Sequence, residues 1–394
     1  MGINSSKEEK LDQSQLIHYL PDEPEQLKNY LNQHFKEIQV SPYNSEIHQN
    51  IQAYQLKINQ KRQIAIIKHQ NNNQRSFETY QNELQKQLSL RHETLTSLYK
   101  FMAKENENFC SSFYEFLIVK EYIHLNLQQE FQERQKQGVS YEECELWHII
   151  VSVIAGIAYL KQNYLFYGNL SPKSIFITDQ GVVKIQPRNF FTQEITPYQQ
   201  FITNDRFFKS GHYISPQQYY SYHDQQQKTL ITSYFSQNQN QNINSKSDVY
   251  ALGLVIIELI NGQNIPELQD IYDKLPQLQQ KISNLLENKV KNNYSQFFYN
   301  FLKQLLKNDE EKRPDVEELF EKLEKISSEN IQVSDRLFFL EFYKQTKSQQ
   351  SQNSNINSNQ NNLSIENIQQ SNPNSENRKS ADQLQYSQCI KNTL

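Results

Sequence analysis

The stretch from Tyr164 to Asn189 constrains the fold of this chain more than any other. Two short runs of apolar and β-branched residues, at 175–177 and 182–185, flank the turn sequence Asp179-Gln180-Gly181. Glycine adopts positive φ without steric cost, so a tight turn at Gly181 can join the two runs as antiparallel strands. The sequence therefore predicts a β-hairpin at this point.

Hydrophobic periodicity predicts mostly strands before the hairpin and helices after it. Strands are expected at 51–58, 62–69 and 114–122, and helices at 24–35, 77–90 and 141–162. Further helices are expected at 247–261, ended by Gly262, and at 271–287, 294–307, 316–327 and 334–343. This order predicts an α+β fold with a small β-rich lobe and a larger α-helical lobe.

Composition excludes several classes of function. The net charge is -4 and the 40 Lys and Arg residues are dispersed, so we expect no nucleic-acid partner. Cys110, Cys144 and Cys389 show no disulfide or metal-site spacing, which fits a reducing, cytoplasmic location. We also expect no membrane-spanning segment, because no apolar run approaches the roughly 18 residues that a span needs.

The first residues match a lipidation motif. Met1-Gly2-Ile3-Asn4-Ser5-Ser6 fits the M-G-x-x-x-[ST] pattern for myristoylation of Gly2. A single acyl chain binds membranes only marginally, and the nearby Lys7 and Lys10 are offset by acidic neighbours. We expect a weak, reversible, peripheral membrane contact if Gly2 is acylated.

The loop before the hairpin, Tyr167-Gly168-Asn169-Leu170-Ser171-Pro172-Lys173-Ser174, resembles the protein-kinase catalytic loop H-R-D-L-K-P-x-N. Other stretches resemble further kinase motifs in the family's order: Lys68 the strand lysine of V-A-I-K, Glu83 its helix glutamate, Glu121-Tyr122 the hinge, Ser215-Pro216-Gln217 the A-P-E motif, Ser247-Asp248-Val249-Tyr250-Ala251-Leu252-Gly253 the S-D-V-W-S-x-G motif, and Lys312-Arg313-Pro314 the late K-R-P. Pro187 follows Asn169 by 18 residues, the family's own interval to D-F-G.

The resemblance implies a protein-kinase-like domain at residues 35–330. Its N-lobe is expected at about 35–122 and its C-lobe at about 123–330, with a Gln/Asn-rich insert at 222–245. An N-terminal extension at 1–34, an appended helix at 331–344 and a disordered tail at 345–394 flank the domain.

The residues that carry phosphoryl transfer in the family are replaced. Asn169 stands at the catalytic Asp, Ser171 at the loop Lys, Ser174 at the metal-binding Asn and Pro187 at the Asp of D-F-G. Asn cannot accept the substrate proton, and Pro has no side-chain oxygen for Mg²⁺. We therefore expect no catalytic residue and no metal site.

The nucleotide site is altered as well. Residues 40–50 contain no glycine, whereas the family's phosphate-binding loop is glycine-rich. Ile66, Phe176 and Lys120 align with positions around the adenine, Lys120 at the gatekeeper, so we expect these side chains to fill the site. An alignment shifted by one residue would place Ala65 at the position of Ile66. No cofactor is expected; if ATP binds at all, Lys68, Glu83, Glu121 and Tyr122 would hold it.

The alignment also predicts internal contacts. An isolated buried charge costs several kcal/mol, so Lys120 is expected to reach Glu83 or to replace Lys68 as its partner. Asp248 is expected to cap its helix and to accept hydrogen bonds from the backbone of residues 167–170.

Two further expectations concern side chains that link parts of the domain. Gln217 and Arg313 are expected to form a hydrogen bond where the family has an ion pair. Gln87, Tyr167 and Arg188 take the places of the stacked side chains that join the lobes of active kinases, and two of them are polar.

Gly168 replaces the Arg that, in the family, binds a phosphorylated residue of the activation segment.

The resulting hypothesis is a pseudokinase: a catalytically inactive domain that acts as a protein-binding scaffold or allosteric regulator in signalling. Its expected partners are other proteins, such as an active kinase. One alternative is a divergent Ser/Thr protein kinase that retains ATP binding and phosphorylates protein hydroxyls, with metal-free binding or with a carboxylate from outside the motifs, such as Asp179 or Asp205. Another is a kinase-fold enzyme with different group-transfer chemistry. An open pocket lined by Lys68 and Glu83 would favour either enzyme.

Overall fold

A computed structural model describes residues 16–17, 19–41, 50–57, 62–71, 74–108, 111–165, 167–168, 170–187, 213–220, 245–269 and 274–330. The chain divides into two compact units, Met1–Glu321 and Lys322–Leu394. Gly2, residues 222–244 of the Gln/Asn-rich insert, the helix expected at 334–343 and the tail at 345–394 lie outside the described residues.

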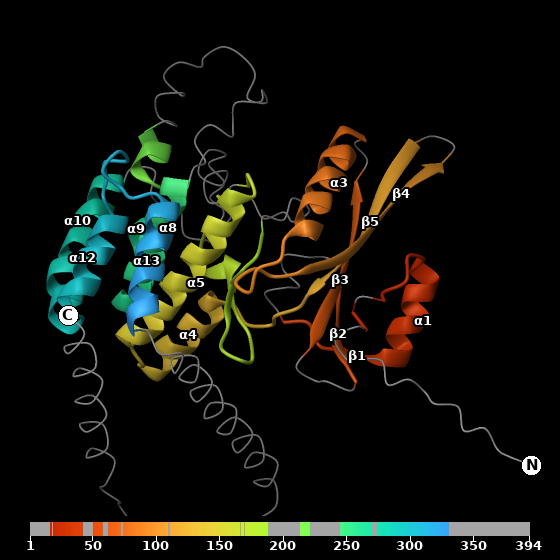
Figure 1. Cartoon of the computed structure of the whole chain (residues 1–394), viewed down its shortest axis with the longest axis horizontal. Helices are drawn as coiled ribbons and strands as arrows, with labels where there is room; N and C mark the ends of the chain where they lie inside the picture. The colour runs from red at the N-terminus through yellow and green to blue at the C-terminus, as the bar shows by residue number, and fades with distance from the viewer. Residues whose placement is uncertain are drawn as a thin grey trace, which may run out of the picture. The chain divides into compact units, whose positions relative to one another are not determined.

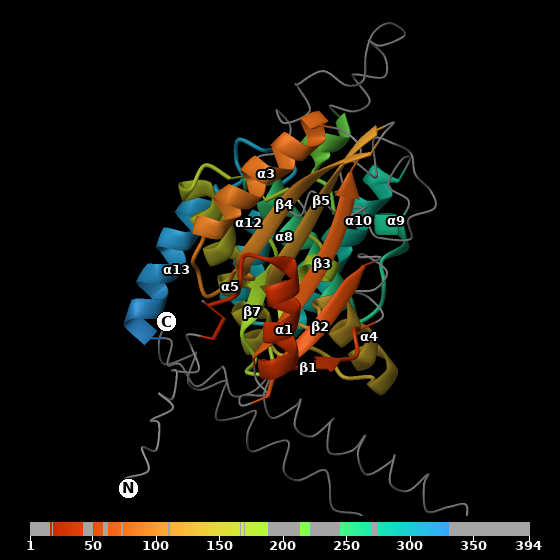
Figure 2. The same cartoon turned by 90° about the vertical axis from the view of Figure 1, so that its right-hand side faces the viewer.

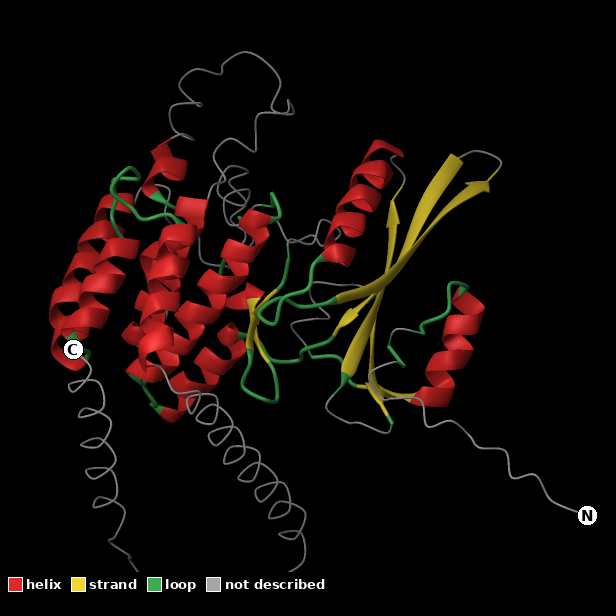
Figure 3. Cartoon of the chain, in the orientation of Figure 1, coloured by secondary structure: helices red, strands yellow, loops and turns green. Residues whose placement is uncertain are grey.

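The first half of the chain forms a five-stranded antiparallel sheet in the order β1-β2-β3-β5-β4 (Figures 1 and 3). Its strands are β1 (Phe35–Ile38), β2 (Ile51–Leu56), β3 (Gln63–Asn71), β4 (Leu98–Asn108) and β5 (Ser111–Glu121). The strands predicted at 51–58, 62–69 and 114–122 are confirmed, whereas β4 was not predicted.

Helices cover both faces of this sheet. Helix α1 (Pro24–His34) and helix α3 (Gln74–Ser89) lie on opposite sides of it (Figures 1 and 2). We call the face under α3 the inner face, because it lies on the side of the helical lobe, and the face under α1 the outer face. Covering both faces buries four consecutive side chains of β3, from Ile64 to Ile67.

The N-terminal segment before β1 belongs to the same compact unit as the sheet. Leu27 and Leu31 of α1 pack with Ile64 and Ile66 on the outer face. The Lys57 ammonium donates to the carbonyls of Asn32, at 2.7 Å, and Gln33, at 3.0 Å, near the C-terminal end of α1. Lysine at this end of a helix satisfies carbonyls that have no partner within the helix.

The predicted hairpin is confirmed and is tied to the N-lobe through its backbone. Strands β6 (Ile175–Ile177) and β7 (Val183–Ile185) are antiparallel, and Gly181 between them has φ of 76°. The Ile185 N–H donates to the Thr94 carbonyl at 2.8 Å, and the Thr96 N–H donates to the Ile185 carbonyl at 3.0 Å. The segment between α3 and β4 is therefore paired with β7.

The second half of the described chain is helical, as Figure 3 shows. Its helices are α4 (Leu127–Gln137), α5 (Glu143–Gln162), α8 (Ser245–Asn261), α9 (Pro266–Gln269), α10 (Leu275–Leu285), α11 (Lys291–Asn293), α12 (Gln296–Leu305) and α13 (Val316–Asn330), with a π-helical turn at Leu286–Val290 and a 3-10 turn at Pro172–Ser174. Helix α8 is a core helix that ends as predicted, since Gly262 follows it with φ of 72°. Helix α4 was not predicted.

Helix α5 corrects one expectation. By length and composition alone it is long and apolar enough to span a membrane, with a mean hydropathy of 1.5 over its most apolar window. The sequence-based statement that no apolar stretch approaches that length is therefore too strong. Of the same window, 61% is buried inside the protein, and one such helix is a weak indication, since the core helix of a globular domain has the same properties.

A buried cluster of charges joins α4 to α5. The Arg134 guanidinium donates to both carboxylate oxygens of Glu145, at 2.9 and 2.6 Å, and to Glu130. The Tyr141 hydroxyl donates to Glu130, and the guanidinium carbon of Arg134 lies 4.1 Å from the centre of the Tyr141 ring. All four side chains are buried, so each charge depends on the others for compensation.

Replacing Arg134 with Met should destabilise the fold by about 3–5 kcal/mol, because it leaves two carboxylates buried without a cation. Urea unfolding of the full chain measures this loss. The matched control is Lys136→Met on the same helix, since Lys136 forms an exposed pair with Glu133 and its removal should change stability by less than about 1 kcal/mol. Equal losses for the two variants would contradict the importance of the buried cluster.

Candidate functional site

The inner face of β3 carries an isoleucine where the sequence alignment placed a lysine. Successive side chains of a strand point to opposite faces. Ile67 pairs with Ile118 and packs with Leu84 of α3 on the inner face. Lys68 pairs with Leu117, which packs against the outer-face cluster, and its side chain is exposed. Lys68 therefore points away from the helical lobe.

The predicted pairing of Lys68 with Glu83 is wrong for this structure. Glu83 lies on α3, on the inner face, and its carboxylate accepts from Lys86 at 3.1 Å along the same helix. The reason is the phase of β3, which directs Lys68 to the opposite face of the sheet. In this arrangement the two side chains cannot hold a nucleotide as a pair.

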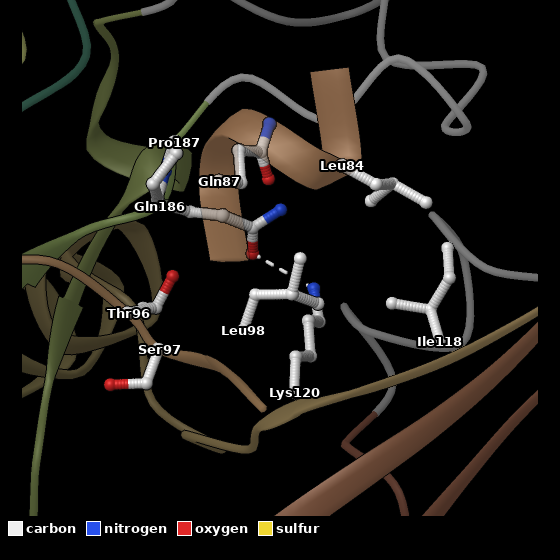
Figure 4. Close-up of a pocket in the computed structure, with 9 residues that line it drawn as sticks. All are labelled: Leu84, Gln87, Thr96, Ser97, Leu98, Ile118, Lys120, Gln186 and Pro187. Atoms are coloured by element: carbon white, nitrogen blue, oxygen red, sulfur yellow. Dashed lines mark hydrogen bonds between the residues drawn. The ribbon is translucent and has the colours of Figure 1, made fainter. Parts of the chain in front are cut away.

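A small cavity lies beside Leu84 and Gln87 of α3 (Figure 4). It is lined by Leu84, Gln87, Thr96, Ser97, Leu98, Ile118, Lys120, Gln186 and Pro187, and its volume is about 30 Å³. Ligand pockets usually measure roughly 300–1,000 Å³, whereas this cavity has room for little more than a water molecule. Lys68 and Glu83 do not line it.

Lys120 crosses this cavity. Its ammonium donates to the Gln186 side-chain carbonyl at 3.0 Å, the dashed contact in Figure 4. The expectation that Lys120 reaches Glu83 is wrong: Lys120 donates to Gln186, the residue just before Pro187, and Glu83 accepts from Lys86. This bond joins β5 to the segment that follows β7.

The two hinge residues after Lys120 are held by the protein itself. The Glu121 carboxylate accepts from the Lys184 ammonium of β7, with both oxygens at 2.9 Å, and from the Ser97 N–H at 3.0 Å. The Tyr122 side chain is buried with Ala53 and Ala65 on the inner face. Both side chains therefore serve internal contacts.

The residues expected around an adenine do not all lie together. Phe176 of β6 packs against Ile123 at the end of the hinge. Ile66 belongs to the outer-face cluster with α1, so the prediction that it fills the adenine site is wrong. Its neighbour Ala65 has the inner-face position, one residue earlier than the alignment placed it.

The loop before the hairpin is held by hydrogen bonds between its own side chains and its backbone. Ser174 donates its hydroxyl to the Ser171 carbonyl at 3.0 Å and accepts the Ser171 N–H at 3.1 Å. The buried Tyr167 donates its hydroxyl to the Ser174 carbonyl at 3.3 Å. Pro187 is buried beside the cavity, while Asn169, Arg188 and Asp205 lie outside the described residues.

The sequence matches the protein kinase domain family over residues 49–323, more than half of the chain. This chain belongs to the protein kinase family. The match lies within the 35–330 range of the motif resemblance and confirms the α+β, two-lobed protein-kinase fold.

Two relatives are also protein kinases by name. One is the "Probably inactive leucine-rich repeat receptor-like protein kinase" of Arabidopsis thaliana, 26% identical over 151 residues, which are 37% of this chain and 13% of the relative. The other is the "Serine/threonine-protein kinase PrkC" of Bacillus subtilis (strain 168), 25% identical over 185 residues, which are 47% of this chain and 24% of the relative. This chain thus spans about a quarter or less of either relative.

Two framework residues of this kinase domain, Arg313 and Asp248, make hydrogen bonds within the described residues. Arg313 is buried, and its guanidinium donates to the Gln217 side-chain carbonyl at 3.1 Å and to the Lys246 backbone carbonyl at 2.9 Å. Burial lowers the pKa of Arg313 to about 10, so the guanidinium keeps its charge at neutral pH. Asp248 accepts from the Gly168 N–H at 3.0 Å and so supports the loop before the hairpin.

The described residues form neither a metal site nor a substitute for the catalytic carboxylate. No group of three or more His, Cys, Asp or Glu side chains there is placed to hold a metal ion. Asp179, considered as a substitute carboxylate, is exposed in the turn between β6 and β7 and does not line the cavity.

Sequence reasoning missed three functional positions: Ile67 on the inner face, Lys184 as the partner of Glu121, and Gln186 as the partner of Lys120. Ile67 was detectable in principle, because Ala65 is the small residue of this strand and places the lysine position at 67 rather than 68. Lys184 and Gln186 carry no sequence signal, since their partners lie 63 and 66 residues away.

The pH dependence of stability should change when Asp248 is replaced. Burial raises the pKa of Asp248 to about 7, opposed by the hydrogen bond from Gly168, and no described group donates to its second carboxylate oxygen. An unfolded Asp titrates near 3.9, so between about pH 4 and 7 the folded state holds a proton that the unfolded chain releases. Stability contributed by this group therefore falls as pH rises, by at most about 1.4 kcal/mol per pH unit.

Asp248→Asn keeps an acceptor for the Gly168 N–H and cannot ionise. Urea unfolding at pH 4.5, 6.0 and 7.5 should show the variant gaining stability relative to the natural chain as pH rises. Asp179→Asn, at an exposed position, is the control and should leave the pH profile unchanged. Parallel profiles for Asp248→Asn and the natural chain would contradict the buried, proton-binding carboxyl.

Proposed function

We propose that this protein kinase domain is a pseudokinase: it neither binds Mg·ATP nor transfers phosphoryl groups, and it acts by binding other proteins. The observation that carries the proposal is Ile67 on the inner face of β3. A phosphate anchor needs a cation on that face, and an isoleucine packed against Leu84 and Ile118 supplies neither charge nor hydrogen bond.

The neighbouring groups support the same conclusion. Lys120 is the described cation that lines the cavity, and it already donates to Gln186. The hinge carboxylate of Glu121 is paired with Lys184. Phosphoryl transfer also requires a carboxylate and metal ligands, and the positions that supply them in active kinases hold Asn169, Ser174 and Pro187.

A role in protein binding follows from what is kept. The buried contacts of Arg313, Asp248 and Arg134 maintain a folded kinase domain without its chemistry, which is what a scaffold or allosteric regulator requires. The relative named as probably inactive is consistent with this reading. The proposed partners are other proteins, for example an active kinase, in the cytoplasm or in weak contact with a membrane through an acylated Gly2.

The second candidate is a divergent Ser/Thr protein kinase. Lys120 favours it, because its ammonium lies at the cavity and would anchor a phosphate if it released Gln186. The similarity to PrkC is consistent with it. It requires a nucleotide site, so a binding experiment separates it from the pseudokinase.

Thermal unfolding of the full chain tests the proposal. We expect the same melting temperature with and without millimolar ATP, both in Mg²⁺ and in EDTA. A ligand at 100 times its Kd stabilises the folded state by about 2.7 kcal/mol, which shifts the melting temperature of a domain of this size by several degrees.

A shift that needs Mg²⁺ would overturn the proposal and favour the divergent kinase. The Lys120→Met variant is the matched control, since loss of the shift in this variant would place the nucleotide at Lys120. A shift in EDTA as well as in Mg²⁺ would equally contradict a domain without nucleotide binding.

A further inference from the structure

The hinge tyrosine is enclosed by the sheet instead of pointing into solvent. Tyr122 is 5% exposed. Its ring belongs to a cluster with Ala53 of β2 and Ala65 of β3, and Ile38, Val40 and Ile51 pack around the cluster. The ring therefore lies against the inner face of the first three strands.

Two small side chains make room for this ring. Ala53 and Ala65 are directly paired across β2 and β3, and neither has any exposed surface. The inward side chains around them, Ile38, Val40 and Ile51, are larger, so two adjacent alanines leave space for a neighbouring side chain. Tyr122 fills it, which satisfies the close packing that protein interiors require.

The polar end of the ring is matched as well. The Tyr122 hydroxyl accepts the Ser41 N–H at 2.8 Å, just after β1, and the Tyr122 N–H donates to the Gln63 carbonyl at 3.1 Å at the start of β3. One residue thus joins the hinge to two strands of the sheet. The next residue, Ile123, packs against Phe176 of the C-lobe.

We propose that Tyr122 is an internal ligand: its phenol ring occupies a site for a planar aromatic ring beneath Ala53 and Ala65. The chain thus contains a latent site for a phenol-sized aromatic molecule, kept closed by its own hinge residue. This inference rests on the proposed function, because both require that no nucleotide base lies in the same place in the natural protein.

The internal ligand explains how the hinge and the first strands stay together without a bound nucleotide. In an enzyme of this family a nucleotide would have to enter and leave this region, whereas Tyr122 is covalently attached. Removing the ring should leave the site empty and weaken the packing between the hinge and the first strands. A free molecule with the same structure as the side chain should fill the site and restore this packing.

The test uses p-cresol, which is the tyrosine side chain as a free molecule, with the full-length variant Tyr122→Ala. We expect a lower melting temperature than that of the natural chain and a rise of several degrees when p-cresol saturates the site. Adenine is the second probe, because it is planar but larger. If the variant is insoluble, the yield of soluble protein after refolding with and without p-cresol replaces the melting temperature.

Two controls separate a specific site from a general cavity. Tyr122→Phe keeps the ring and loses only the bond to Ser41, so it should show no response to p-cresol. Tyr114→Ala removes a ring that is equally buried, at 5% exposed, but stacks on Phe77 elsewhere in the sheet. It should respond much less at the same p-cresol concentration.

No stabilisation of Tyr122→Ala by p-cresol would overturn the inference, as would an equal response of Tyr114→Ala. These outcomes are distinct from failure of the proposed function. ATP binding by the natural chain overturns the proposed function whatever the variant does, whereas a variant that ignores p-cresol overturns only the role of Tyr122.

Discussion

Burial of both faces of β3 is the constraint on which the described site depends. Helix α1 covers the outer face and α3 with Tyr122 covers the inner face, so four successive residues of the strand must be apolar. A buried lysine would cost several kcal/mol unless it were paired. The first charged residue of the strand, Lys68, falls where the outer face is exposed, so β3 places no lysine or arginine on the inner face.

The lobes of this kinase domain are joined near the hinge by contacts between protein groups. Lys184 binds Glu121, Lys120 binds Gln186, and the backbone of Thr94 pairs with that of Ile185. Partly buried ion pairs and backbone hydrogen bonds each contribute modestly, but together they link the hinge, β5 and β7 in one arrangement.

Sequence patterns predicted the hairpin, α5 and α8 because turn chemistry and long apolar periods are local signals. The sequence did not show which side chains of β3 point to the inner face, because the four consecutive apolar residues from Ile64 to Ile67 show no alternation. Helix α4 escaped notice because buried charges such as Arg134 replace apolar residues on its packed side. Strand β4 is largely polar, and its pairing with β5 fixes it more than its own composition does. The replacements at Asn169, Ser171, Ser174 and Pro187 follow from motif spacing and remain predictions of role.

The solvent exposure of the Lys68 ammonium tests most directly whether this lysine points away from the helical lobe. Amine acetylation of the full chain, read out by mass spectrometry, compares the labelling rate of Lys68 with that of exposed Lys136 in the presence and absence of millimolar Mg·ATP. The account predicts similar labelling of the two lysines and no effect of nucleotide. Protection of Lys68 by Mg·ATP would place its ammonium at a bound phosphate and would contradict the orientation of Lys68 toward the outer face.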